Sequence, residues 1–368
     1  MTYPLLTGQA GGNSCRAEQH RRLSGGIVPD KAPTIIDGMG SAALLPSAQV
    51  PPPARNGIAW LDRAIASGLT AMNVTMGVKG VAMGADDFRA YLHSVHGYLS
   101  YFQIEPRLRH VKRIADIEAA KLGGQLGIIF GCQGLDSKIE GDPSLILIMA
   151  ELGQRIIQLM YNERSEIGYG CFEKEDYGLS EFGRICIREI NDNHIVLDLA
   201  HAGQKTARDA IAFSKATPVI THANIRRLKH HPRNIEDATM SALAERGGVL
   251  GITAFAPFCE KAPGIRPTID DYIDHIAYAV DKMGIDHVGI GSDFFEGESI
   301  VRFEKFFRRR YPEVVGHYTI DTVYATGFEV VDDFKALAAA LSHRGFAADE
   351  TAKLLGGNFL RVFREVWG

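Results

Sequence analysis

The sequence lacks the usual features of membrane and secreted proteins. No apolar stretch approaches the ~20 residues of a membrane-spanning helix, and the first residues, MTYPLLTGQAGGNSC, contain no apolar core of a secretory signal. The C-terminal VFREVWG carries no lipid-anchor signal. The five cysteines are odd in number, widely spaced and without a CxxC pair, which argues against a disulfide framework or a zinc knuckle. We therefore expect a cytoplasmic protein with no membrane partner.

The sequence also lacks an excess of positive charge. Its net charge is −4 and its pI is about 6.4, so no nucleic-acid partner is expected. The strongest basic cluster, three arginines at 308–310, is typical of a solvated helix face. The contents of 46% hydrophobic and 23% charged residues are ordinary for a globular protein. A chain of 368 residues can bury a large core without covalent staples.

Two further absences narrow the fold class. No G-x-G-x-x-G motif follows the first apolar run, which argues against a dinucleotide-binding fold. No internal repeat of the solenoid type is present. What the chain does contain is a series of short runs rich in Ile, Val and Leu, typical of strands that are buried on both faces of a parallel sheet. The eight runs span residues 34–37, 69–76, 125–133, 155–162, 194–201, 217–224, 248–255 and 287–294.

Amphipathic stretches with a period near 3.6 residues separate these runs and predict helices. The clearest are residues 86–102, 181–191, 271–283 and 332–345. Eight strands with intervening helices predict an α/β fold of the (β/α)₈ TIM-barrel type. We expect residues 33–368 to form this single barrel, with an insertion after the eighth strand (about 295–328) and C-terminal helices. Residues 1–32, rich in Gly, Ser, Pro and charge, are predicted to form an N-terminal arm.

Polar side chains end several of the predicted strands, and barrel enzymes carry their chemistry at these C-terminal strand ends. Histidine side chains suit Zn²⁺ or a related divalent ion, and an aspartate beside a metal-bound water can act as a general base. The candidates are Gln133, Tyr161, Asn162, Asp198, His201, His222 and Asp293.

Each candidate also has a structural explanation. A lone histidine at a barrel mouth is more often a hydrogen-bonded structural residue than a ligand. We expect Asp198 to orient a neighbour or to cap a helix. Cys132 alternates with Gln133, so only one of the two can face the mouth, and a buried apolar role suits the cysteine. The functional interpretation therefore rests on His201 and His222 occurring together with Asp293.

From about residue 34 to the C-terminus, the sequence resembles the membrane (renal) dipeptidases, which are binuclear-zinc members of the amidohydrolase superfamily. The segments that carry the resemblance are LDLAH (197–201), PVITHAN (218–224), HHPRNIED (230–237), HVGIGSDF (287–294) and LGGNFLRVF (355–363).

The resemblance implies a metal-dependent hydrolase and assigns roles to individual residues. His201 and His222 would bind one metal ion, and Asp293 would handle the catalytic proton. Arg233 would contact the carboxylate of the substrate, a role that suits its planar guanidinium. Tyr161 and Asn162, at the end of the fourth strand, are also expected to contact the substrate.

Four residues on three predicted strands depart from the family pattern. Met39 and Ser41 replace the His-x-Asp pair of the first strand, Gln133 replaces the bridging glutamate, and Tyr161 replaces a further histidine, as in bacterial relatives. Two divalent ions a few ångströms apart need carboxylates to offset their repulsion. We therefore expect at most one metal ion, such as zinc, on the histidine pair and Gln133.

Three hypotheses for the function remain open. The first is a dipeptidase-like amidohydrolase that acts on an amide bond of a small carboxylated substrate with at most one metal ion. The second is a metal-free acid/base enzyme, an isomerase or a lyase, that acts on a substrate of the same kind. The third is a non-catalytic homologue that binds a ligand, since the fold alone does not decide among these. The sequence also leaves open whether the chain forms a homo-oligomer.

Overall fold

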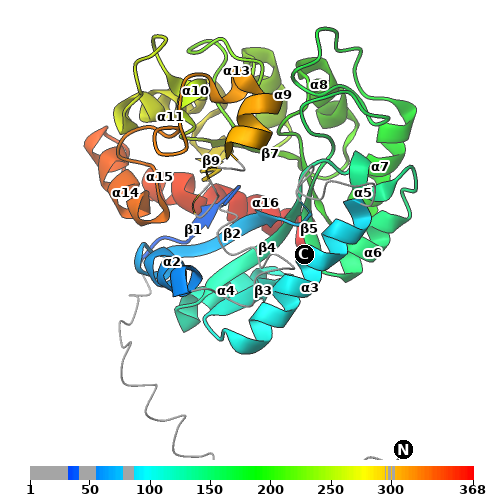
Figure 1. The fold of residues 1–368 in the computed structure, drawn as a ribbon, viewed down its shortest axis with the longest axis horizontal. Coiled ribbons are helices and arrows are strands. Elements are labelled where there is room, and N and C mark those ends of the chain that lie inside the picture. The colour runs from blue at the N-terminus through cyan, green and yellow to red at the C-terminus, as the bar shows by residue number, and fades with distance from the viewer. Residues whose placement is uncertain (1–31, 41–54, 78–86, 295, 297–299, 301–302) are drawn as a thin grey trace, which may run out of the picture. The chain divides into compact units, whose positions relative to one another are not determined.

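A ring of parallel strands surrounded by helices forms the centre of the chain in the computed structural model (Figure 1). The structure describes residues 32–40, 55–77, 87–294, 296, 300 and 303–368. The strands follow one another around the ring in the order β1-β2-β4-β5-β6-β7-β8-β9, and every neighbouring pair in this order is parallel. Their bounds are β1 Ile35–Asp37, β2 Leu69–Thr75, β4 Leu126–Cys132, β5 Gln154–Gln158, β6 Val196–Asp198, β7 Val219–Ala223, β8 Val249–Ile252 and β9 Val288–Ile290.

Contacts between β9 and β1 bring the two ends of the sheet together. The Gly38 amide donates to the Ile290 carbonyl over 2.8 Å, and the Asp293 amide donates to the Met39 carbonyl over the same distance. The buried Asp37 carboxylate adds two bonds, because it accepts from the Ser292 amide at 2.8 Å and from the Ser292 hydroxyl at 2.5 Å. The result is a nearly closed barrel of eight parallel strands.

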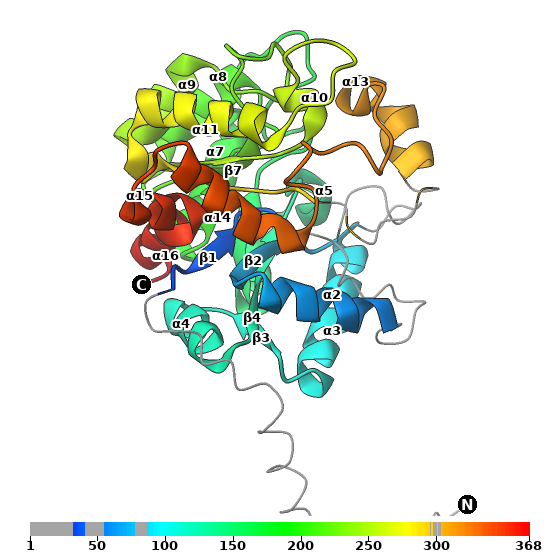
Figure 2. The same cartoon turned by 90° about the vertical axis from the view of Figure 1, so that its left-hand side faces the viewer.

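Helices cover the outside of the barrel (Figures 1 and 2). Those between the strands are α2 Arg55–Ala66, α3 Asp87–Ile104, α4 Ile114–Gly123, α5 Asp136–Ile139, α6 Leu145–Glu151, α7 Glu181–Asp192, α8 Gln204–Phe213, α9 Asp237–Glu245, α10 Ala256–Cys259 and α11 Ile269–Met283. After β9 come η4 Phe303–Arg308, α13 Pro312–Val315, α14 Phe334–His343, α15 Ala348–Ala352, η6 Lys353–Gly357 and α16 Asn358–Trp367; single turns lie at η3 Ile285–His287 and η5 Val331–Asp333. No helix within the described ranges combines the length and apolar character needed to cross a bilayer.

The C-terminal helix α16 fills the barrel end opposite the C-terminal strand ends. Phe359 and Phe363 pack in one buried cluster with inward-facing strand residues such as Ile36, Ile156 and Val249. Phe359 lies so close to Gly289 that a Cβ atom there would come within 2.7 Å of its ring. Figure 2 shows α16 and α13 toward opposite ends of the barrel. Side chains of α16 therefore close one end of the barrel. The other end, where the strands end, is the expected place for an active site.

Each of the eight predicted runs overlaps one barrel strand, and each of the four predicted helices overlaps α3, α7, α11 or α14. The prediction of a (β/α)₈ barrel is thus confirmed. The sequence missed the short strand β3 (Leu108–Val111), which pairs with the N-terminal half of β4. Its two central residues are polar and half-buried, so it does not resemble a continuous apolar run. The predicted N-terminal arm, apart from residue 32, and part of the predicted insertion lie outside the described residues.

Candidate active site at the barrel mouth

Residues from four strand ends meet at one end of the barrel. Gln133 follows β4, Asn162 lies beyond β5, His201 lies three residues beyond β6, and His222 lies near the end of β7. Hydrogen-bond contacts join His201 to Asn162 and to His222, and His222 to Gln133. Since parallel strands end at the same mouth of a barrel, the structure brings these side chains together as their positions in the sequence suggest.

The two histidines face each other through the same ring nitrogen. The Nε2 atoms of His201 and His222 are 3.0 Å apart. Burial is the main cause that holds the pKa of each histidine well below its ordinary value, and the positive charge of Arg233 lowers the pKa of both further. Both rings are therefore neutral imidazoles at neutral pH, the form in which histidine binds metal ions.

The opposite ring nitrogen of each histidine has a partner from the protein. His201 Nδ1 lies 2.6 Å from Asn162 Oδ1, and His222 Nδ1 lies 2.8 Å from Thr221 Oγ1. The Thr221 hydroxyl in turn donates to Asp198 Oδ2 over 2.6 Å. Of the two roles considered for Asp198, the structure shows the first, since its carboxylate orients a neighbouring side chain. The sequence did not single out Thr221, whose role depends on a hydrogen bond that no motif records.

Gln133 completes the polar group around His222. Its Nε2 atom lies 3.4 Å from His222 Nε2. The fully buried Lys138 holds the backbone in place from behind, because its ammonium group donates to the carbonyls of Gln133 at 3.0 Å and of Gly134 at 3.2 Å. Cys132 packs in the apolar layer with Phe130. The alternation along β4 therefore turns glutamine to the mouth and cysteine away from it, as expected.

Arg233 is a buried cation, 2% exposed, beside the histidine pair. Its Nη2 atom donates to the His222 carbonyl over 3.2 Å, and its guanidinium lies over the Phe258 ring at 5.6 Å from the ring centroid. Burial raises the pKa of the Cys171 thiol to about 11, and the charge of Arg233 acts in the opposite direction. Within the described part of the chain no carboxylate forms an ion pair with Arg233. A buried guanidinium of this kind is suited to an anionic group of a ligand.

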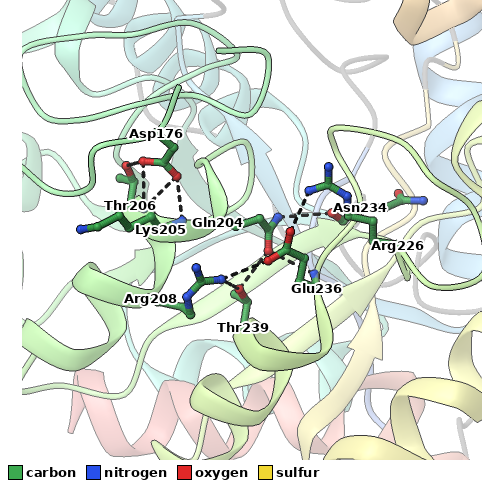
Figure 3. Close-up of polar contacts among 9 residues, drawn as sticks. All are labelled: Asp176, Gln204, Lys205, Thr206, Arg208, Arg226, Asn234, Glu236 and Thr239. Carbon is green, nitrogen blue, oxygen red and sulfur yellow. Dashed lines mark hydrogen bonds and ion pairs between the residues drawn. The ribbon is translucent and has the colours of Figure 1, made fainter. Parts of the chain in front are cut away.

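A polar network holds the loop that carries Arg233 (Figure 3). Gln204, the first residue of α8, donates through Nε2 to the Asn234 carbonyl at 3.2 Å. Gln204 Oε1 accepts from the Glu236 amide at 3.1 Å and from the Thr239 hydroxyl at 2.9 Å. Asn234 Nδ2 donates to the Phe258 carbonyl at 2.9 Å. Contacts with α8, α9 and α10 therefore fix the part of the loop that follows Arg233.

The loop before α7 also holds helix α8 in place (Figure 3). Asp176 accepts from the Lys205 amide at 2.7 Å and from the Thr206 hydroxyl at 2.7 Å, so it supplies the negative charge that a helix N-terminus favours. Glu236 forms ion pairs with Arg208 at 3.2 Å and Arg226 at 3.0 Å. These contacts connect the loops of β5, β6 and β7 into one support for the mouth.

Asp293 lies three residues beyond the end of β9. Burial raises its pKa to about 7, and the charge of Arg233 acts in the opposite direction. Its backbone is held in the left-handed region, with φ of 55°, and its carbonyl accepts from the Tyr324 hydroxyl at 2.5 Å. A carboxyl group with a pKa near neutrality can both take and return a proton under ordinary conditions.

The structure also shows how the departing positions are used. The buried Met39 presents its sulfur to the Thr75 hydroxyl at 3.6 Å, and Ser41 lies outside the described residues. The Tyr161 ring stacks on the His201 ring with centroids 4.2 Å apart. Among the described residues, no group of three or more His, Cys, Asp or Glu side chains is arranged to hold a metal ion. The described donors at this mouth thus differ from a carboxylate-rich binuclear site.

The comparisons with known proteins agree on one family. The family model described as membrane dipeptidase (peptidase family M19) matches residues 57–315. Dipeptidase tcpJ of Claviceps purpurea is 25% identical over 295 residues, which cover 77% of this chain and 63% of tcpJ. An uncharacterized dipeptidase of Schizosaccharomyces pombe is 34% identical over 259 residues, 68% of this chain and 55% of that protein. The chain thus spans little more than half of the length of these curated relatives.

Solved structures give the same result for the fold. The crystal structure of an amidohydrolase from Pseudomonas aeruginosa superposes with a TM-score of 0.79 at 32% sequence identity, covering 91% of this chain and 97% of that one. A metallopeptidase from Rhodobacter sphaeroides, crystallised with a phosphinate mimic of the dipeptide L-Ala-D-Ala, has a TM-score of 0.74 at 20% identity and 91% coverage of this chain. The similarity to the Rhodobacter sphaeroides enzyme shows only that the two chains share a fold.

Proposed function

Because this chain belongs to the membrane dipeptidase family, we propose that it hydrolyses the amide bond of a small substrate that carries a free carboxylate. His201 and His222, with Gln133, would hold at most one divalent metal ion, for which zinc is the natural candidate. Asp293 would transfer the catalytic proton. Arg233 would bind the substrate carboxylate, and Tyr161 and Asn162 would border the substrate.

One observation carries the proposal of a metal ion. Two neutral imidazoles turn the same nitrogen toward one point, at a separation of 3.0 Å, while the protein occupies both of their other nitrogens. Two histidine ligands of one tetrahedral zinc ion, each bonded at about 2.05 Å, would lie about 3.3 Å apart. The donor set and its spacing therefore fit a single metal ion. Such an ion supplies Lewis acidity, which polarises a carbonyl group and lowers the pKa of water.

A second metal ion does not fit the residues present. A thioether is a poor ligand for Zn²⁺, and the sulfur of Met39 already accepts a hydrogen bond from Thr75. Gln133 is neutral and cannot bridge two cations as a carboxylate does. We therefore propose a mononuclear site.

The residues of the chain have distinct tasks in this proposal. Arg233 anchors the substrate carboxylate through charge-assisted hydrogen bonds. The anchor lies one hydrogen bond from the His222 backbone, so it places the scissile amide near the histidine pair. Asp293, whose pKa is about 7, accepts a proton from the attacking water and returns it to the leaving amine.

Support for a cytoplasmic location comes from the cysteines. The four within the described residues, Cys132, Cys171, Cys186 and Cys259, are all free thiols. Free thiols are typical of reducing compartments, so we propose that the protein works in the cytoplasm.

Metal content and hydrolysis test the proposal together. The purified protein should bind one zinc ion per chain by elemental analysis after dialysis against zinc, and it should release amino acids from a panel of dipeptides and N-acyl amino acids. Binding of carboxylated ligands without metal and without hydrolysis would favour the non-catalytic hypothesis. A metal-free protein that isomerises or eliminates such substrates would favour the acid/base hypothesis.

A further inference from the structure

The proposed function requires that both Nε2 atoms at the mouth are free of protons, and the structure contains a device that meets this requirement for His222. We propose that Asp198, acting through the Thr221 hydroxyl, is the positioning residue that fixes the proton of His222 on Nδ1. This inference rests on the proposed function for its purpose. The hydrogen bonds that carry it are those of the protein without a metal ion.

Asp198 is buried in the barrel wall with three hydrogen-bond donors around it. Its Oδ1 atom accepts from the backbone amides of Ala200 and Thr221, both at 2.9 Å. Its Oδ2 atom accepts from the Thr221 hydroxyl at 2.6 Å. Burial raises the pKa of this carboxyl above its ordinary value, and the three converging donors act in the opposite direction. In its ionised form the carboxylate can accept hydrogen bonds but cannot donate one.

An ionised Asp198 fixes the direction of the whole chain of hydrogen bonds. The single proton of the Thr221 hydroxyl is committed to Asp198, so toward His222 the oxygen can act only as an acceptor. His222 Nδ1, 2.8 Å away, must then donate its N–H to Thr221. A neutral imidazole has one proton, so Nε2 is left with its lone pair directed at the His201 ring nitrogen 3.0 Å away.

The proton of His201 is also fixed on Nδ1, in this case by a direct contact with Asn162. Its Nδ1 atom lies 2.6 Å from the amide oxygen of Asn162, which can only accept. The Cys171 thiol donates to the same oxygen at 3.5 Å. Both histidines therefore carry their protons away from the mouth, and two lone pairs face each other across 3.0 Å. That arrangement is unfavourable until a cation lies between them, so the relay prepares the site for a metal ion.

The inference makes an unusual prediction for Asp198→Asn. The two backbone amides that converge on Oδ1 require an oxygen there. The new NH₂ group must then occupy the position of Oδ2 and donate to Thr221 Oγ1. The Thr221 hydroxyl would turn its own proton toward His222 Nδ1, and the proton of His222 would move to Nε2. One nearly isosteric substitution should reverse the relay and block the ligand.

Nitrogen NMR of metal-free protein with ¹⁵N-labelled histidine tests this directly, with His222→Gln used to assign the signals of His222. We expect the proton on Nδ1 in the wild type and on Nε2 in Asp198→Asn. Thr221→Ser keeps the hydroxyl and is the matched control, so it should match the wild type. Thr221→Val removes the hydroxyl and should leave His222 as a mixture of both forms. If Asp198→Asn does not fold, Thr221→Val tests whether the Thr221 hydroxyl fixes the proton of His222.

Zinc affinity, measured by competition with a chromophoric chelator, is the second readout. Asp198→Asn and Thr221→Val should bind zinc about 10 to 100 times more weakly than the wild type, the usual effect of losing a partner of a ligating histidine. Thr221→Ser should restore the wild-type affinity. Unchanged zinc affinity together with an unchanged proton position in Asp198→Asn would overturn the relay and leave the proposed function intact. A wild type that binds no zinc would overturn the proposed function, and the proton positions would still decide the relay.

Discussion

Replacement of Asp37 by asparagine is expected to flatten the pH dependence of stability between pH 4.5 and 7.5. Asp37 is a buried carboxyl group at the junction of β1 and β9. Burial is the main cause that raises its pKa from 3.8 to about 7, against hydrogen bonds from Ser292 and Met39 that lower it. No basic side chain is among the causes of this shift.

The sign of the effect follows from the direction of the shift. The folded protein keeps the proton of Asp37 up to about pH 7, whereas the unfolded chain releases it near pH 3.8. The folded state therefore binds more protons in this interval, and stability falls as pH rises. The contribution is fully present below the unfolded pKa and is lost as pH rises through the folded one. Between pH 4.5 and 7.5 the loss amounts to ~3 kcal/mol.

Asparagine fits the site because the surrounding hydrogen bonds can adapt. Its amide oxygen can accept from the amides of Ser292 and Met39, which now bond to Oδ1 of Asp37. Its NH₂ group would face the Ser292 hydroxyl, which can redirect its proton to the Met39 carbonyl at 3.2 Å. The variant should thus keep the junction while losing the ionisable group.

Urea unfolding of metal-stripped protein at several pH values measures the effect. The wild type should lose ~3 kcal/mol more than Asp37→Asn between pH 4.5 and 7.5, and the difference between the two proteins removes the contribution of every other titrating group. Asp37→Ala is the contrast, because it leaves two buried amides without an acceptor and should cost about 1–3 kcal/mol at each. Equal slopes for the wild type and the asparagine variant would refute the reasoning.

Three further predictions concern the mouth. Arg233→Ala should weaken the binding of a carboxylated dipeptide by about 30-fold or more in calorimetry, since loss of a buried charge contact costs about 2–5 kcal/mol; equal binding by wild type and variant would remove the anchor. Asp293→Asn should lower kcat by roughly 10² to 10⁴ in a dipeptide hydrolysis assay while zinc content stays at one per chain; an unchanged kcat would exclude it as the proton carrier. Met39→His, Ser41→Asp and Gln133→Glu together should raise zinc stoichiometry from one toward two by elemental analysis, and only in part, because supporting partners of these ligands are also needed; no gain at all would mean that other residues prevent the second ion.

The barrel and the grouping of its mouth residues followed from sequence because both depend on local patterns. Runs of Ile, Val and Leu mark strands that are buried on both faces, and parallel strands in a barrel end at one mouth. Placing His201 and His222 at neighbouring strand ends was therefore sufficient to bring them together. The short strand β3 escaped because its central residues, Arg109 and His110, interrupt the apolar pattern.

The supporting contacts could not be predicted in the same way, because they depend on three-dimensional geometry. Thr221 precedes His222 in a strand, and alternation alone would place the two side chains on opposite faces. The structure nevertheless brings its hydroxyl within 2.8 Å of the His222 ring. The raised pKa of Asp37 depends on the junction of β1 with β9, which are 255 residues apart at the Asp37–Ser292 contact. No short-range pattern records either relationship.

The charges at the mouth support the proposal that the site holds at most one metal ion. Arg233 adds one fixed positive charge that already disfavours protonation of both histidines. One divalent ion on the histidine pair would bring the local charge to three, offset by the carboxylates of Asp293 and Asp198. Burial raises the pKa of each carboxyl in the absence of a cation, and a positive charge nearby favours the ionised form. A second ion would add two more positive charges without a new carboxylate at Met39 or Gln133, and repulsion between two divalent ions in a buried site is far larger than that between surface charges. This charge balance supports the proposal of one cation and one anionic substrate at the mouth.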